Sequence, residues 1–398
     1  MSAKRVLFVH HTSLAGGAER SLAELVSAIR AEDVEPTVVL PHDGPLAGML
    51  SAADIPVRLI PMSRMKRTVN PFRIAMYLRS LTRGSRRLAG LAKEVGAEII
   101  HSNSTVAHIY GGEAASKLGV PAVWHVRDVI PLGAMGGRMA KTATAAIAIS
   151  DFVVRYLQGE GVEGDRIVKI LNGIDLSATP EPEAAGRLRR ATRRELEIHE
   201  ESPVVGTISA IVPWKRPEDF VSAFERLIER EAELLGSAEV DLASHRPLRG
   251  LFIGSDITGD HPDLERRLRQ RADAAGGERI VFAGWRDDVP KVLTALDVYV
   301  STSVGEPFGR GVAEAMAAGL PVVARRSGAM EELVSDGETG RLAGESPAEF
   351  ASATLDLLRD ADLRRRMGEA ARERAFSRFD IRRAASEVAA LYGRLLSG

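Results

Sequence analysis

The sequence predicts an α/β protein with two doubly wound domains, each built on a parallel sheet. Short apolar runs alternate with amphipathic segments through both halves of the chain. Strands that alternate with helices imply βαβ units with right-handed crossovers, and hence parallel sheets. A chain of 398 residues is also long enough for two domains of roughly 200 residues each.

Six apolar runs in the first half are interpreted as strands: Val6–Val9, Pro36–Leu40, Val57–Ile60, Ile99–His101, Ala122–His125 and Ala145–Ile149. Helical patterns lie between most of them, as at Glu19–Arg30 and Val106–Lys117. The second half repeats the scheme, with strands expected at Val204–Ile208, Gly250–Ile253, Ile280–Phe282, Asp297–Val300 and Pro321–Ala324. A turn-rich linker follows Ile170–Asp175, so we expect one domain over residues 1–173 and another from residue 174 onward.

The composition excludes several classes of protein. A net charge of -1 gives no overall attraction to nucleic acid, and the absence of cysteine excludes disulfides and thiolate metal sites. The first apolar run, Val6–Val9, is too short for a signal sequence or a membrane span. These features predict a soluble, cytoplasmic protein.

The strongest motif runs from Ser301 to Val323, where an expected strand leads through a glycine-rich turn into a helix. The start of a helix exposes unpaired N–H groups and a partial positive charge, which suit a diphosphate. Glu306 and Glu314, eight residues apart, offer carboxylates that accept hydrogen bonds from sugar hydroxyls. The motif therefore favours a ligand with both phosphate and sugar over an ordinary strand–turn–helix connection.

The segment from Glu306 to Val323 resembles the signature of the group 1 (family 4) retaining glycosyltransferases. The resemblance implies the GT-B fold, in which two facing Rossmann-like domains enclose an interdomain cleft. It implies that residues 1–173 bind the acceptor and that residues 174–380 bind the nucleotide sugar. It also implies that a C-terminal helix, at about residues 381–398, packs back onto the first domain.

The resemblance further implies a retaining transfer from a nucleotide-diphosphate sugar, expected to be a UDP-sugar, to an acceptor hydroxyl. Lys215 would neutralise the leaving diphosphate, His125 would orient the sugar or the acceptor, and Glu306 would hold the sugar. Glu314 would bind the ribose. The other residues expected to bind the donor are Gly16, Gly17, Arg216, Trp285, Arg286, Phe308, Gly309 and Arg310. The acceptor is expected to be a sugar, a lipid-linked compound or a small molecule, in cell-envelope glycan, glycolipid or natural-product biosynthesis.

One departure from the family pattern leaves alternatives open. In the family, an arginine lies five residues before the position of Lys215, and here that position holds Ala210. Arg216 or Arg310 would replace this cation in an active transferase. The alternatives are a nucleotide-sugar-binding protein without activity, and a sugar phosphorylase or epimerase of the same fold.

Metal chemistry is not expected at this site. The sequence has no Asp-x-Asp motif to hold a divalent ion on a diphosphate, and no His/Cys cluster at zinc spacing. We therefore expect transfer that needs neither metal nor cofactor, with lysine, arginine and helix dipoles in place of magnesium.

A basic amphipathic stretch runs from Arg64 to Lys93, with nine basic residues and no acidic one. Such a stretch suits an anionic membrane surface or a phosphorylated acceptor, and a solvated helix face is the alternative. The residues proposed for this contact are Arg64, Lys66, Arg67, Arg83, Arg86 and Arg87. A membrane contact would place the protein at the inner membrane face.

Overall fold

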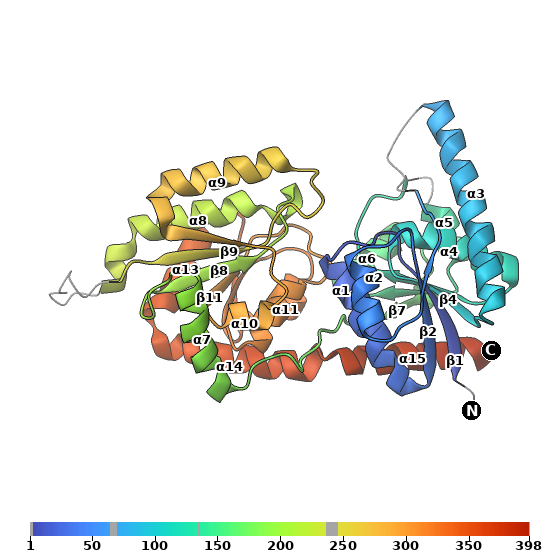
Figure 1. Ribbon diagram of the computed structural model, residues 1–398. Helices are drawn as coiled ribbons and strands as arrows, with labels where there is room; N and C mark the ends of the chain where they lie inside the picture. Colours follow the sequence, from blue (N-terminus) through green and yellow to red (C-terminus); the bar gives the residue numbers. More distant parts are fainter. Residues whose placement is uncertain (1–2, 64–69, 134–135, 236–245, 398) are drawn as a thin grey trace. The chain divides into compact units, whose positions relative to one another are not determined.

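The computed structural model describes residues 3–63, 70–133, 136–235 and 246–397. The chain divides into two compact units (Figure 1). Unit 1 comprises Met1–Asp175 and Phe379–Gly398, and unit 2 comprises Leu176–Arg378. Each unit contains its own parallel sheet, so the structure confirms the expectation of two Rossmann-like α/β domains.

The sheet of unit 1 has seven parallel strands in the order β3-β2-β1-β4-β5-β6-β7. Their bounds are β1 Lys4–Val9, β2 Val34–Leu40, β3 Val57–Leu59, β4 Ile99–Ser102, β5 Ala122–Val126, β6 Ala145–Ala148 and β7 Ile167–Lys169. The first six confirm the strands expected from the apolar runs. β7 was not expected, because its three residues at the sheet edge are only partly buried and carry no long apolar run.

Helices cover both faces of this sheet (Figure 1). They are α1 Gly17–Ala28, α2 Pro45–Ala52, α3 Pro71–Glu94, α4 Thr105–Leu118, α5 Gly136–Thr142, α6 Asp151–Gly159 and α15 Ile381–Ser397. Residues of α1, α2 and α15 share one hydrophobic core with the sheet. Residues of α3 and α4 form the core on the other face. The C-terminal helix therefore belongs to the first unit.

The sheet of unit 2 has six parallel strands in the order β10-β9-β8-β11-β12-β13. They are β8 Val204–Ile208, β9 Arg249–Ile253, β10 Ile280–Gly284, β11 Val298–Ser301, β12 Val322–Arg325 and β13 Gly340–Ala343. The helices are α7 Pro182–Glu195, α8 Pro217–Glu229, α9 Pro262–Gly276, α10 Val289–Leu293, α11 Arg310–Ala317, α12 Met330–Leu333, α13 Pro347–Arg359 and α14 Ala361–Arg378. Short 3-10 turns complete both units: η1 Ile29–Glu32, η3 Gly164–Arg166, η4 Pro213–Lys215, η5 Glu231–Leu235 and η6 Gly277–Arg279.

Both strand orders reverse direction at one point, between β1 and β4 in unit 1 and between β8 and β11 in unit 2. In open α/β sheets, ligands bind at the carboxyl ends of the strands beside this switch point, because the adjoining loops part there. The strand order thus predicts where each unit binds its ligand.

No helix in the described part of the chain is long and apolar enough to cross a bilayer. The described part of the basic stretch forms α3 from Pro71 onward, which confirms the helical spacing there.

A buried histidine makes the core of unit 1 sensitive to acid. His108 of α4 has no exposed surface, and its ring stacks on Trp124 at a centroid distance of 5.1 Å. Its Nε2 lies 3.3 Å from the carbonyl oxygen of Met139. Burial disfavours the charged imidazolium and lowers the pKa of His108 from 6.5 to about 4, although the Met139 carbonyl opposes this change.

We expect the free energy of unfolding to fall by about 2 kcal/mol through His108 between about pH 7.5 and about pH 5. The lowered pKa means that the unfolded chain binds a proton in this range and the folded chain does not. Stability is therefore present above pH 6.5 and is lost as the pH falls towards 4. Urea unfolding of His108→Gln should show a shallower pH dependence than the wild type. His42→Gln, at an exposed histidine, is the matched control, and an equal slope in all three proteins would contradict the prediction.

Candidate functional site

The loops that follow β8 and β11 flank the switch point of the unit 2 sheet. Lys215 closes η4 after β8, and Glu306 lies in the loop between β11 and α11. The Lys215 ammonium donates a hydrogen bond to the Glu306 carboxylate, and these side chains are only 20% and 10% exposed. Lys215 Nζ also lies 4.3 Å from the centroid of the Trp214 ring. The structure therefore brings together two of the three residues expected to be catalytic.

Hydrogen bonds to neighbouring loops hold this pair in place. Thr302 Oγ1 donates to the carbonyl oxygens of Lys215 and Arg216 at 3.1 and 2.9 Å. The Glu306 carbonyl oxygen accepts a hydrogen bond of 2.9 Å from the Ala329 amide. Because both loops are attached to the same group of strand ends, the cation and the carboxylate are positioned before any ligand arrives.

The second carboxylate of the motif has its own cation. Glu314, on α11, forms an ion pair with Arg310 at 2.7 Å, with both side chains about 15% exposed. Burial raises the pKa of Tyr299, and the nearby charges of Glu314 and Glu306 raise it further. The Tyr299 hydroxyl donates to the Ile208 carbonyl oxygen at 3.3 Å. Each carboxylate of the motif is thus paired with one cation.

The glycines of the motif allow the loop to pack closely against the sheet. Gly309 has a φ of +99°, and a Cβ there would meet the Met330 side chain. A Cβ on Gly311 would lie only 2.6 Å from Tyr299 Oη. Protein atoms thus occupy the space beside both Cα atoms. Close packing and a left-handed backbone therefore explain why glycine is needed here.

The structure separates the two cations that were proposed to replace the arginine missing at Ala210. Arg216 forms a bidentate pair with Asp219 at 3.1 and 3.2 Å. The Asp219 carboxylate also accepts a hydrogen bond from Arg325, so Arg216 shares its partner with a second arginine. Arg310 is instead paired with a carboxylate of the motif itself. Of the two cations, Arg310 is therefore the one whose partner belongs to the Ser301–Val323 motif.

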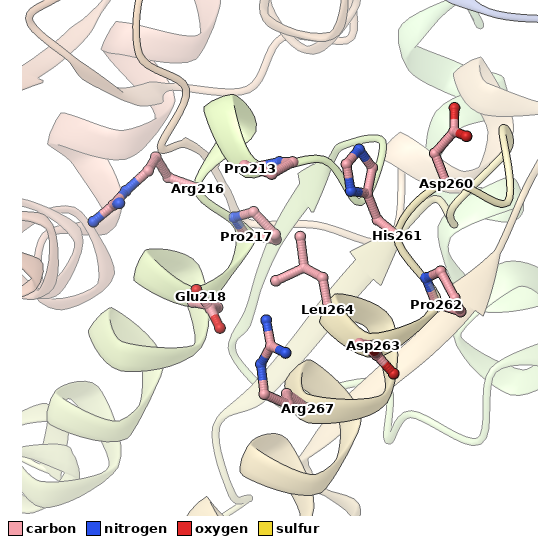
Figure 2. A pocket seen from close by; sticks show the side chains of 10 residues that line it. All are labelled: Pro213, Arg216, Pro217, Glu218, Asp260, His261, Pro262, Asp263, Leu264 and Arg267. Carbon is pink, nitrogen blue, oxygen red and sulfur yellow. The ribbon is translucent and has the colours of Figure 1, made fainter.

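A pocket of about 360 Å³ lies beside η4, at the first turns of α8 and α9. Its lining residues are Pro213, Arg216, Pro217, Glu218, Asp260, His261, Pro262, Asp263, Leu264 and Arg267 (Figure 2). Three of them are carboxylates, which would repel a diphosphate. We therefore do not assign the phosphate groups of a ligand to this pocket.

Trp285 and Arg286, which are expected to bind the donor, follow β10 at the edge of the sheet. Trp285 is 38% exposed, and its Nε1 donates to Asp287 at 3.3 Å. Arg286 is engaged by Asp288 and Glu195, whose hydrogen bonds raise its pKa. β10 lies three strand positions from β11, or about 14 Å. Trp285 and Arg286 both have partners on their own loop, and Arg286 also pairs with Glu195 of α7; their contact with a ligand stays a prediction.

A second cluster lies at the switch point of unit 1. Gly16 precedes α1, which begins at Gly17, and Glu19 lies in its first turn. The Glu19 carboxylate lies 3.1 Å from His10 Nε2 and accepts a hydrogen bond from Thr12. Burial raises the pKa of Glu19, but the bonds and charge of His10 and the bond from Thr12 outweigh burial and lower it to about 2. The Gly16–Gly17 turn is thereby tied to the end of β1.

Two buried side chains at the end of β5 adjoin this cluster. His125 is 3% exposed, and Arg127 donates to Asn103 at 2.6 Å and to Asn172 at 2.7 Å. Asp128 accepts two hydrogen bonds from Thr105, while burial raises its pKa. The guanidinium of Arg127 is therefore held in place, and His125 lies in a positively charged, water-poor environment.

Sequence analysis missed several members of these clusters. His10, His101 and Asn103 lie at strand ends beside the switch point, so a search for polar residues at those positions would have found them. Tyr392 lies on α15 and approaches His101 only through the fold. No local signal distinguishes it from the other buried residues of that helix.

The exposed stripe of α3 carries both apolar and basic residues. Phe72 and Met76 are 73% and 53% exposed, and Arg83, Arg86 and Arg87 are exposed further along the helix. The buried stripe includes Leu81 and Leu88 and packs on the sheet. Arg64, Lys66 and Arg67, which were proposed for the same contact, lie outside the described residues.

Two family models match the chain. The model described as "Glycosyl transferases group 1" matches residues 189–374, within unit 2. The model described as "Glycosyltransferase Family 4" matches residues 15–178, nearly all within unit 1.

Curated relatives match parts of the chain. The D-inositol 3-phosphate glycosyltransferase of Corynebacterium efficiens is 31% identical over 248 residues, which cover 61% of this chain and 54% of the relative. The N-acetyl-alpha-D-glucosaminyl L-malate synthase of Bacillus anthracis is 29% identical over 203 residues, covering 50% and 48%. The chain thus spans about half the length of these curated relatives.

Solved structures match the whole fold. The Anabaena protein Alr3699/HepE in complex with UDP-glucose has a TM-score of 0.81 at 23% identity, covering 98% of this chain and 99% of that one. A glycosyltransferase from Rickettsia africae has a TM-score of 0.80 at 20% identity, with both chains covered completely. The fold is GT-B, and with both family models matched, the chain belongs to the group 1, or family 4, glycosyltransferases.

Proposed function

We propose that this protein is a retaining glycosyltransferase that moves a sugar from a UDP-sugar to an acceptor hydroxyl. The observation that carries the proposal is the Lys215–Glu306 pair at the switch point of unit 2, inside the segment that matches the family. Relatives named as glycosyltransferases, and a neighbour of the same fold solved with UDP-glucose, support this choice of donor.

In this proposal the donor binds along the strand ends of unit 2. Glu314 accepts hydrogen bonds from the ribose, and Lys215 and Arg310 face the diphosphate. Glu306 and the amides of Phe308 and Gly309 hold the sugar. The first turn of α11 adds amide groups that have no acceptor within the helix, and these favour an anion.

The transfer needs no protein nucleophile. The bond between the sugar C1 and the diphosphate oxygen breaks while a bond from C1 to the acceptor oxygen forms on the same face. The proton of the acceptor hydroxyl passes to the leaving phosphate oxygen. Lys215 stabilises the charge that develops on the diphosphate, and a preformed cation of this kind lowers the barrier because it does not need to reorganise.

A donor panel tests the proposal. UDP-, GDP- and ADP-sugars are offered to the full chain in a calorimeter, with and without EDTA, and nucleotide release is followed over time. We expect one UDP-sugar to bind and to release UDP slowly at an unchanged rate in EDTA. With an acceptor alcohol present, proton NMR of the glycoside formed should show the anomeric configuration of the donor, because a glycoside, unlike a free sugar, does not mutarotate. An inverted glycoside would refute retention.

A nucleotide-sugar-binding protein without activity is the second candidate, and Ala210 favours it. This candidate predicts binding without nucleotide release for every donor and acceptor. Ala210→Arg would then be expected to restore release. Failure to bind any donor would count against both candidates.

We expect Glu314→Ala to weaken donor binding by about tenfold, because hydrogen bonds to a charged acceptor contribute about 1.5 kcal/mol or more. The turnover rate of the saturated enzyme should change much less. Calorimetry gives the dissociation constant, and Glu331→Ala, which removes an exposed carboxylate of the same unit, is the control. Donor affinity equal to that of the wild type would remove Glu314 from the site.

We further propose that α3 lies on an anionic membrane surface. Its exposed stripe begins with Phe72 and Met76 and continues with arginines, so apolar and cationic groups would reach the interface together. A lipid-linked acceptor would then be presented beside unit 1.

Charge reversal at Arg83, Arg86 and Arg87 should reduce binding to anionic vesicles at least about tenfold, since each basic residue near such a surface contributes about 1 kcal/mol. Sedimentation with vesicles that contain phosphatidylglycerol measures the bound fraction. Reversal of three exposed arginines of unit 2, Arg187, Arg190 and Arg365, gives a control of equal net charge. Equal sedimentation of both variants would leave α3 as a solvated helix face or a site for a soluble acceptor.

A further inference from the structure

Three buried rings of unit 1 form a hydrogen-bonded row that runs from α15 to the neighbouring strands β4 and β5. The Tyr392 hydroxyl on α15 lies 2.6 Å from His101 Nδ1 on β4. His101 Nε2 lies 3.1 Å from His125 Nδ1 on β5. Tyr392 and His101 have no exposed surface, and His125 is 3% exposed. The row therefore runs from the C-terminal helix to the strand end where the sequence predicts a site residue.

The far end of the row is a buried nitrogen that lacks a partner. His125 Nε2 forms no hydrogen bond with any described residue. A buried polar atom in this state is unfavourable unless a ligand supplies the missing group. His125 lies at the carboxyl end of β5, where ligands of α/β sheets bind, so a ligand there can supply the missing group.

Counting the protons shows which atom donates each hydrogen bond along the row. If the Tyr392 hydroxyl donates to His101 Nδ1, then His101 Nε2 carries a proton and donates to His125 Nδ1. The proton of His125 then lies on Nε2. In the reverse direction, the hydroxyl proton of Tyr392 and the lone pair of His125 Nε2 would both be buried without a partner. The first arrangement leaves one buried polar group without a partner, and the reverse arrangement leaves two. Because each such group costs free energy when it is removed from water, the first arrangement is favoured.

The surroundings keep His125 neutral. Burial lowers the pKa of His125 well below 6.5, and the charges of Arg127 and His101 lower it further. His101 is affected in the same way by burial, Arg127 and His108. With both rings neutral, each has one proton, so the direction of the row decides which nitrogen of His125 is the donor.

We propose that Tyr392 and His101 are positioning residues that set His125 in the tautomer with the proton on Nε2. This N–H donates a hydrogen bond to an oxygen of the bound sugar or acceptor. Because Nε2 then has no free lone pair, His125 does not act as a base towards the acceptor hydroxyl. The role towards the substrate rests on the proposed glycosyl transfer, whereas the tautomer is a property of the protein alone.

Nitrogen NMR of the full chain tests the tautomer without substrate. The nine histidines are labelled with 15N, and His125 is assigned by the loss of its signals in His125→Asn. We expect Nε2 of His125 to give the shift of a protonated nitrogen and Nδ1 that of a bare one. The opposite pattern in the wild type would overturn the proposal. This measurement leaves Tyr392, His101 and His125 unsubstituted, so it does not depend on how a variant folds.

Tyr392→Phe then tests the source of the tautomer. Without the hydroxyl, both directions leave the same number of unpaired groups, so His125 should pass from one tautomer to a mixture. Tyr110→Phe is the matched control: it also removes a buried hydroxyl in unit 1, which is bonded to Ser63 and has no contact with the row. A His125 spectrum that Tyr392→Phe does not change would overturn the positioning role.

Kinetics with the donor found in the panel test the role towards substrate. We expect Tyr392→Phe to lower kcat by about three- to tenfold, which is the contribution of one neutral hydrogen bond, with little change in KM, while Tyr110→Phe leaves both unchanged. A mixed tautomer with a wild-type kcat would refute the contact with substrate. If the wild type turns over no donor, the proposed function fails, and the NMR result alone decides the tautomer.

Discussion

Glu306→Gln should reduce the turnover rate by about a hundredfold or more, because removing one preorganised charged group from an active site typically has this effect. Glutamine has nearly the same shape and still accepts a hydrogen bond from a sugar hydroxyl, but it carries no negative charge. Glu306 is 8% exposed and pairs with Lys215, so its charge acts in a poorly solvated environment. Donor affinity should change only about threefold or less, so steady-state kinetics and calorimetry together separate the two effects.

Glu331→Gln, the same change at an exposed position in unit 2, is the control. A double-mutant cycle with Lys215→Met extends the test. If the ion pair acts as a unit, the second substitution should add little to the first, because residues in direct contact do not contribute independently. Wild-type kinetics in Glu306→Gln would refute the assignment of the site.

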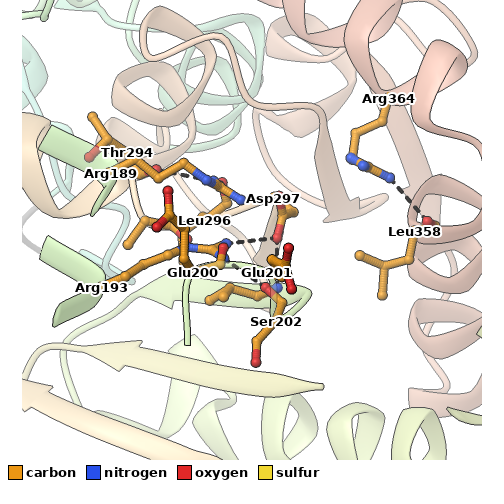
Figure 3. A network of polar contacts seen from close by, with 12 residues as sticks. Arg189, Arg193, Glu200, Glu201, Ser202, Thr294, Leu296, Asp297, Leu358 and Arg364 are labelled. Carbon is orange, nitrogen blue, oxygen red and sulfur yellow. Dashed lines mark hydrogen bonds and ion pairs between the residues drawn. The ribbon is translucent and has the colours of Figure 1, made fainter. Parts of the chain in front are cut away.

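Asp297→Ala should destabilise unit 2 by about 3–5 kcal/mol, because it leaves a buried arginine without its counter-charge. The Asp297 carboxylate, just before β11, accepts hydrogen bonds from Arg189 at 2.6 Å and from Arg193 at 3.0 Å (Figure 3). It also accepts one of 2.7 Å from the Val204 amide. Arg193 has no exposed surface, and burial lowers its pKa despite the opposing effect of Asp297. This cluster therefore ties α7 to the beginning of two strands.

Urea unfolding followed by tryptophan fluorescence measures the change, since Trp214 and Trp285 both lie in unit 2. Asp263→Ala breaks a pair with Arg266 in which both side chains are at least 65% exposed. An exposed pair contributes at most about 1 kcal/mol, so this control should be nearly neutral. Arg193 also donates to the carbonyl oxygens of Ala295 at 3.0 Å and Ser202 at 2.8 Å. A midpoint for Asp297→Ala equal to that of the control would show that these carbonyl groups alone satisfy Arg193.

The strands of both units could largely be predicted from the sequence, because a parallel strand covered on both faces requires an apolar run. β7 and β13 were not predicted, since they are short edge strands with half-exposed residues such as Ile167 and Leu342. The helix of the basic stretch could be predicted from its spacing. Local sequence patterns are thus sufficient to predict strands that are buried along their whole length, but not short strands at the edge of a sheet.

Proximity within the candidate site was harder to predict. The motif indicated Glu306 and Glu314. The pairing of Glu306 with Lys215 depends on which loops the switch point brings together, whereas Glu314 and Arg310 lie four residues apart on one helix and pair locally. Arg325, which donates a hydrogen bond to Asp219 from 106 residues away, likewise has a partner that only the fold provides.

Unit 1 contains residues from both ends of the sequence, and this has a consequence for how the chain is synthesised. Helix α15 supplies seven buried residues to the core on one face of the sheet: Ile381, Ala384, Ala385, Val388, Ala389, Leu391 and Tyr392. A ribosome must first translate residues 176–378, which takes about 10–40 seconds at about 5–20 residues per second. All of unit 2 is therefore synthesised before unit 1 is complete. Until α15 emerges, the apolar sheet face that it covers in unit 1 stays exposed. We expect chaperones that bind nascent chains to recognise that face.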